Sequence, residues 1–147
     1  MIQRVQTIYL LLAEIFIALI FAFPIAEIAS KGEVFIFKAT GVLKGHEVII
    51  NGLPLIILLG IILVLHFVVI YSFKKRIRQM RILVFTIVLM LGLFGIFYYF
   101  AYASFTEQAI AFKVTVAFPL AAIILDFLAI REIGKDEAMV RSMDRIR

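Results

Sequence analysis

Four long apolar runs separate the charged residues of this 147-residue chain, and they limit its possible folds more than any other feature. A helix of about 20 residues crosses a hydrocarbon core of about 30 Å. At 65% hydrophobic residues and a mean hydropathy of +1.13, the chain lies outside the range of soluble domains. We therefore expect an all-α membrane protein, with residues 1–147 folded as one domain, an antiparallel four-transmembrane-helix bundle. The expected spans are residues 7–26, 53–73, 82–102 and 114–130.

The positions of Lys and Arg near the span ends predict the orientation. Eleven lie on one side of the membrane: Arg4, Lys74, Lys75, Arg76, Arg78, Arg81, Arg131, Lys135, Arg141, Arg145 and Arg147. The other side carries four: Lys31, Lys38, Lys44 and Lys113. Basic residues favour the cytoplasmic side, so both termini are expected there. This topology also explains the net charge of +5, and we expect the lipid bilayer, not nucleic acid, as the partner of these cations.

The only sizeable loop, residues 27–52, is expected on the outer side. Its segments "EVFIFKA" and "HEVII" are rich in β-branched and aromatic residues, and Gly41 and Gly45 lie between them. This pattern predicts a small β-hairpin on the membrane surface, with an irregular loop as the alternative. Because an isolated hairpin is marginal in water, it should pack on the aromatic cluster "FYYFAY" that ends the third span.

Two prolines fall inside the expected spans. Pro24 and Pro119 each remove one backbone hydrogen bond, so we expect a bend in the first and in the fourth helix.

The tail, residues 131–147, changes character after Gly134. That glycine is expected to end the fourth span, and Asp136 to cap a separate short amphipathic helix on the cytoplasmic side. Its mixed charges suggest docking onto the basic loop 74–81 or onto a protein partner; a solvated helix without a partner is the alternative. The candidate docking residues are Arg4, Asp136, Glu137, Arg141, Asp144 and Arg145.

The two ends of the chain resemble a known family. The opening "MIQRVQTIYLLL" and the closing "LDFLAIREIGKDEAMVRSMDRIR" are similar to uncharacterised integral membrane proteins of Bacteroidota grouped as domain of unknown function 4293. The resemblance extends over the whole chain. It implies a four-span protein of the bacterial inner membrane and no established activity.

Three ionisable residues lie inside the expected spans, where burying a charge costs about 2.5 to 3.5 kcal/mol. They are Glu14, His66 and Asp126, and Thr86 in the third span falls at a similar depth. Each span thus places one polar side chain in the cytoplasmic third of the bundle. We call Glu14, His66, Thr86 and Asp126 the polar layer.

The polar layer has two principal interpretations. It can have a purely structural role, in which hydrogen bonds between the helices fix their register. Alternatively, a carboxylate beside an imidazole can carry protons. Glu14 is similar in position to the glutamate of small multidrug exporters, but the long first loop and the absence of tryptophan depart from that family. A metal site is disfavoured, because three potential ligands on three helices form no spacing motif.

Enzymatic motifs are missing from the sequence. It has no cysteine, no phosphate-binding glycine loop, no HExxH motif and no Ser-His-Asp arrangement with an exposed nucleophile. We therefore expect a non-enzymatic protein without a cofactor, acting as an accessory or scaffolding subunit of an envelope assembly, with a small proton-coupled transporter as the alternative.

The expected orientation can be tested by cysteine labelling. Cysteines placed at Lys44 and Ser142 should react from opposite sides, Lys44→Cys from outside and Ser142→Cys only after permeabilisation, because the positive-inside rule separates them. Labelling of both from the same side would contradict the topology.

Overall fold

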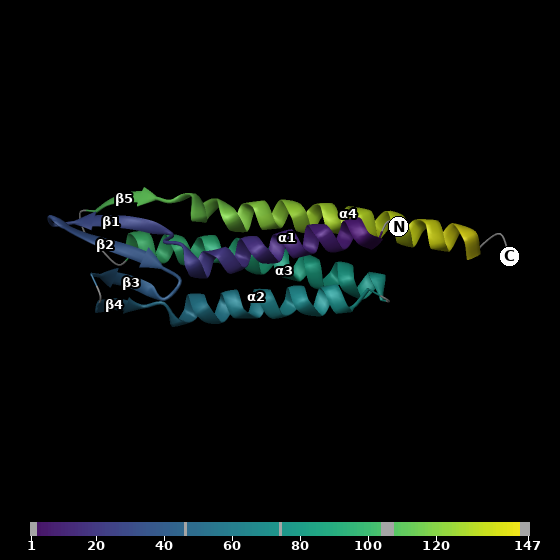
Figure 1. The fold of residues 1–147 in the computed structure, drawn as a ribbon, viewed down its shortest axis with the longest axis horizontal. Helices are drawn as coiled ribbons and strands as arrows, with labels where there is room; N and C mark the ends of the chain where they lie inside the picture. Colours follow the sequence, from purple (N-terminus) through teal and green to yellow (C-terminus); the bar gives the residue numbers. More distant parts are fainter. Residues whose placement is uncertain (1–2, 46, 74, 104–107, 145–147) are drawn as a thin grey trace.

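The computed structural model describes residues 3–45, 47–73, 75–103 and 108–144. Four helices are long and apolar enough to cross a membrane, which agrees with the expected multi-pass membrane protein. They form a bundle in which consecutive helices run in opposite directions, with the two termini at one end and a sheet at the other (Figure 1). The helices are α1 (Gln3–Ala22), α2 (Leu53–Tyr71), α3 (Arg76–Tyr98) and α4 (Phe118–Asp144).

Each helix packs on its neighbours in the chain, and α4 returns to pack on α1. The α1–α4 contact is the most extensive of these helix pairs, whereas α2 and α4 lie diagonally opposite. The core is made by one apolar side chain per turn from each helix. Examples are Ile17, Leu59, Met90 and Ala122, all of which are fully buried. The remaining apolar faces are exposed in the isolated chain, as expected for helices in contact with lipid.

Both expected proline bends were wrong, because the prolines lie at helix ends. The first helix stops at Ala22, and beyond Pro24 the amide of Ile25 donates to the carbonyl of Phe37 in the sheet. Pro119 lies in the first turn of α4, after a 3₁₀ turn over Val114–Ala117. A first-turn proline loses no helical hydrogen bond, so neither position needs a bend.

The expected separate tail helix was also wrong, because α4 continues through Gly134 to Asp144. Glycine in a helix costs only about 1 kcal/mol relative to alanine, and packing can offset that. On either side of it, Ile133 is fully buried and Asp136 is 6% exposed. Asp136 is therefore an interior helical residue and not a cap.

The outer loop forms more than the expected hairpin. Its four strands are β1 (Ala26–Ser30), β2 (Glu33–Lys38), β3 (Gly41–Lys44) and β4 (Glu47–Asn51). A fifth strand, β5 (Gln108–Phe112), comes from the loop between α3 and α4 and pairs with β1. The antiparallel sheet has the order β4-β3-β2-β1-β5. The segment "EVFIFKA" contains β2 and the segment "HEVII" overlaps β4; these two strands do not pair with each other because β3 lies between them.

One face of the sheet packs on the bundle, and this confirms the expected contact with the aromatic cluster. Phe37 of β2 is fully buried and stacks on Phe100, with ring centroids 5.5 Å apart. The ring of Phe97 packs edge-on against the ring of Phe37, with the two centroids 6.1 Å apart. The phenylalanines of "FYYFAY" thus point into the protein, whereas Tyr98 and Tyr99 are exposed. This contact fixes the sheet against the end of the bundle.

The turn after β2 should tolerate no side chain at Gly41. Its φ is +125°, and a Cβ there would lie 2.0 Å from the carbonyl oxygen of Ile50. We expect Gly41→Ala to lower the free energy of unfolding by about 2 kcal/mol or more. Gly60→Ala is the control, because a Cβ at Gly60 meets nothing within 4 Å. Thermal unfolding in detergent measures both; equal stability of the two variants would contradict the described turn.

Candidate functional site

The structure joins two members of the polar layer across the diagonal of the bundle. His66 of α2 and Asp126 of α4 are both fully buried, and His66 Nε2 lies 3.2 Å from Asp126 Oδ1. On its other side, His66 Nδ1 lies 3.0 Å from the carbonyl oxygen of Ile62. This pair connects two helices that do not pack as direct neighbours, so it links opposite corners of the bundle.

The ring contacts determine how the pair shares protons. The carbonyl of Ile62 only accepts, so His66 Nδ1 must be the donor in that hydrogen bond. One further proton then lies between His66 Nε2 and Asp126 Oδ1, either on the ring or on the carboxyl. The pair is thus an imidazolium with a carboxylate, or a neutral imidazole with a carboxylic acid. Both states satisfy the contact.

The other two members are less closely connected. Glu14 of α1 is partly buried and interacts electrostatically with His66. Thr86 is buried in α3, and its hydroxyl donates to the carbonyl oxygen of Ile82 one turn earlier. The structure therefore joins His66 and Asp126, while Thr86 bonds within its own helix.

One polar atom of the pair lacks a partner. Asp126 Oδ2 is buried and accepts no hydrogen bond from the described residues. The described part of the chain also contains no group of three His, Cys, Asp or Glu side chains placed to hold a metal ion.

Two cavities lie at the end of the bundle that carries the termini, and neither is lined by the polar layer. The larger, of about 540 Å³, is bordered by α3 and α4. The smaller, of about 310 Å³, is bordered by α1, α2 and α3 and includes Gln6 and Gln79 in its lining. The buried pair is thus separated from both of these hollows.

The tail residue Asp136 is held by two contacts: one with the basic loop 74–81, as expected, and one with Gln6, which the sequence analysis missed. Its Oδ2 accepts a hydrogen bond of 2.7 Å from Gln6 Nε2, and its carbonyl oxygen accepts one of 2.9 Å from Arg76. Arg4, another candidate docking residue, has no described side chain. The available signal was helical spacing, because Gln6 lies on the same buried stripe of α1 as Leu10 and Ala13. We call the contacts of Asp136 with Gln6 and Arg76 the end clasp.

The remaining candidate docking residues are only partly covered by the structure. Glu137 lines the larger cavity beside Arg76. The side chains of Arg141 and Asp144, and the whole of Arg145, lie outside the described residues.

A family model with the description "Domain of unknown function (DUF4293)" matches residues 2–146. The chain belongs to this family. No curated protein and no solved structure matches it. The DUF4293 match therefore covers the buried pair, the end clasp and the sheet together, and it assigns none of them a function.

The end clasp makes a testable contribution to stability. A hydrogen bond to a charged group contributes about 1.5 to 3 kcal/mol, so Gln6→Ala and Asp136→Ala should be coupled by about that amount in a double-mutant cycle. The control cycle uses Glu132→Ala and Lys135→Ala, whose exposed ion pair in the same helix should give less than about 1 kcal/mol. Additive effects of Gln6→Ala and Asp136→Ala would contradict the clasp.

Proposed function

We propose that the chain is a non-enzymatic protein of the bacterial inner membrane, with both termini cytoplasmic, that acts as an accessory or scaffolding subunit of an envelope assembly. In this proposal the polar layer holds the helices in register. The surfaces outside the membrane contact the partner.

The closed packing of the buried pair carries the proposal. His66 and Asp126 have no exposed surface, and the two cavities are lined by other residues. A transport site needs a path by which substrate and protons reach the titrating groups. A pair enclosed by side chains, and bonded across the bundle diagonal, is better suited to fixing helix positions.

The outer sheet supports the assembly part of the proposal. Its strands β4 and β5 are edges with free backbone groups, and such edges can accept a strand from another chain. Val34 on the outer side of β2 is 61% exposed, and Val48 and Ile49 on β4 are about half exposed. Four helices need no sheet of this kind to cross a membrane, so its apolar exposed groups favour a role in contact with another protein.

One observation favours the transporter as the second candidate. The buried Asp126 Oδ2 lacks a partner among the described residues, and an unpaired carboxyl oxygen beside an imidazole can receive a proton. In that function Glu14 would relay protons between the pair and the surface of α1.

Isosteric amides separate the two candidates. If the polar layer only holds helices, Glu14→Gln and Asp126→Asn should complement a deletion strain fully, because an asparagine N–H can donate to neutral His66 Nε2. Each should change the free energy of unfolding by less than about 1 kcal/mol. A proton carrier would lose function in both variants while remaining folded, since amides do not titrate.

A second substitution shows whether the assay detects damage to the pair. Asp126→Leu leaves His66 Nε2 buried without a partner and should destabilise the protein by about 1 to 3 kcal/mol. Loss of complementation by well-folded Glu14→Gln or Asp126→Asn at normal expression would refute the scaffold proposal, and full complementation by both would refute the transporter.

A further inference from the structure

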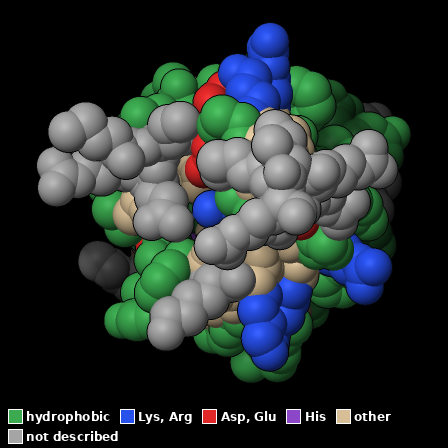
Figure 2. Space-filling model, turned by 90° about the vertical axis from the view of Figure 1, so that its right-hand side faces the viewer, with side chains coloured by type: hydrophobic (Ala, Val, Ile, Leu, Met, Phe, Trp, Pro, Cys, Tyr) green, Lys and Arg blue, Asp and Glu red, His purple; other side chains and the backbone are tan. Residues whose placement is uncertain are grey.

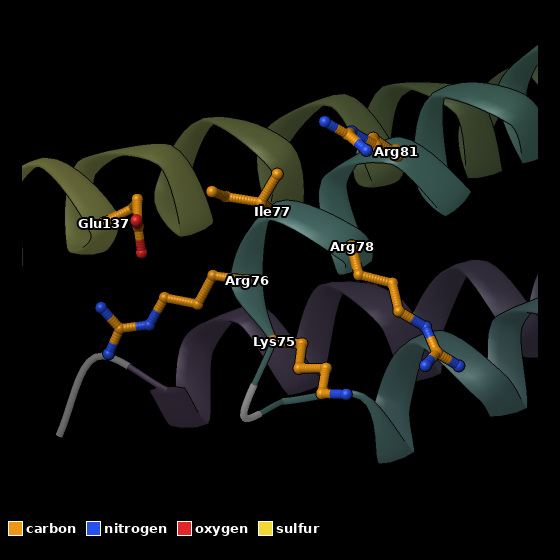
Figure 3. Close-up of a pocket in the computed structure, with 6 residues that line it drawn as sticks. All are labelled: Lys75, Arg76, Ile77, Arg78, Arg81 and Glu137. Atoms are coloured by element: carbon orange, nitrogen blue, oxygen red, sulfur yellow. The ribbon is translucent and has the colours of Figure 1, made fainter.

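The N-terminal end of α3 carries a concentration of positive charge, with one described carboxylate, Glu137, in the lining of the larger cavity beside it. Lys75, Arg76, Arg78 and Arg81 surround the first turns of α3, and we call them the α3 cluster (Figure 3). Among the described residues, Lys75, Arg78 and Arg81 form no ion pair, and Arg76 donates to the backbone carbonyl of Asp136. The first turn also lacks a side-chain cap, so its N–H groups add positive partial charge.

What distinguishes the α3 cluster is that its four cations lie within seven residues of one helix end, whereas three described cations elsewhere are paired singly with carboxylates. At the sheet end, Lys44 lies 2.6 Å from Glu33, and Lys113 lies 2.8 Å from Glu27. On α4, Lys135 pairs with Glu132. In the view of the end opposite the sheet, Lys and Arg side chains project around the rim, with hydrophobic side chains beside them (Figure 2).

Two hollows meet at this cluster, one bordered mainly by charged residues and one bordered by both apolar and polar residues. The larger cavity, of about 540 Å³, is lined by the four cations together with Ile77 and Glu137. The cavity of about 310 Å³ has an apolar part, lined by Leu10, Ile70, Tyr71 and Phe73, and a polar part, lined by Gln6, Thr7, Arg76 and Gln79. Arg76 lines both, and its hydrogen bond to α4 holds it between them. A ligand that fills both hollows needs an anionic end and an apolar end.

We propose that the α3 cluster binds the headgroup of an anionic phospholipid, with an acyl chain in the hollow lined by Leu10, Ile70, Tyr71 and Phe73. The phosphodiester lies among Lys75, Arg78 and Arg81, and Glu137 is a carboxylate that borders the same cavity.

The position in the bundle favours a lipid over a soluble anion. The apolar part of α3 begins at Ile82, so the cluster lies at the depth where headgroups meet the hydrocarbon core. Basic pockets at this level between transmembrane helices bind anionic headgroups. Free phosphate would use the cations but leave the apolar hollow unfilled. This inference is independent of the proposed scaffold role.

Native mass spectrometry of the detergent-purified full chain can test the site. The probes are dioctanoyl phosphatidylglycerol, dioctanoyl phosphatidylcholine and inorganic phosphate, titrated separately. We expect a saturable adduct with phosphatidylglycerol that is at least tenfold tighter than with either other probe. Arg78→Gln with Arg81→Gln should weaken it about 25-fold, since each cation near the surface contributes about fivefold.

Matched variants keep the test specific. Arg78→Lys with Arg81→Lys retains the charges and should retain most of the binding. Lys44→Gln with Lys113→Gln removes two charges at the sheet end and should have no effect. Circular dichroism verifies that all variants are folded.

Several results would overturn the proposal. Equal binding of the two lipids would show no selection for anionic headgroups. Phosphate binding as tightly as phosphatidylglycerol would indicate a soluble-anion site. Unchanged phosphatidylglycerol binding by folded Arg78→Gln with Arg81→Gln, or preference for an added acidic peptide over the lipid, would exclude the α3 cluster as a lipid site.

Discussion

The hydrocarbon core offers no water to the groups buried in it, and this constraint governs the whole structure. Every backbone N–H and C=O inside the membrane must be bonded within its own helix. The prolines therefore lie at the ends of α1, α2 and α4, where a missing N–H is harmless or the helix has already stopped. The sheet, whose edges leave backbone groups free, lies at one end of the bundle (Figure 1).

The same constraint determines where side chains can be polar. Between the helices, His66 and Asp126 bond to each other across the diagonal and leave a single oxygen unsatisfied. Near the termini, Gln6, Arg76 and Asp136 connect α1, α3 and α4, and Gln79 donates to the carbonyl of Val69 at the end of α2. These two levels of polar contact hold together helices whose apolar surfaces alone give little preference for one register.

Much of this architecture could be predicted from the sequence, because span length and charge placement depend on the bilayer more than on tertiary contacts. The four helices follow from their apolar runs. The ends of the helices were harder to predict. Gly134 and Asp136 have the sequence pattern of a helix boundary, but the burial of Ile133 and the hydrogen bond between Gln6 and Asp136 keep α4 continuous. Local pattern cannot reveal a contact between residues 130 positions apart.

In the sheet and in the polar layer, too, the sequence predicted some features and missed those that depend on contacts between distant residues. The strands β2 and β4 were visible as β-branched segments, whereas β5, with the sequence QAIAF, has weak strand character and depends on the free edge of β1. Depth along the helices placed Glu14, His66 and Asp126 at one level, and the structure bonds His66 to Asp126. It could not exclude Thr86, whose hydroxyl is satisfied by Ile82 within the same helix turn.

Site-specific photo-crosslinking in native membranes tests the central claim, that the chain is a subunit of an envelope assembly. A crosslinking amino acid at Val34 or Val48 lies on the exposed sheet, while the same group at Val64 or Phe127 lies on an exposed helix face expected to contact lipid. The account predicts that both sheet positions join covalently to one and the same protein, identified by mass spectrometry, and that both helix positions give no such product. If the sheet positions also yield no protein product, the account is contradicted.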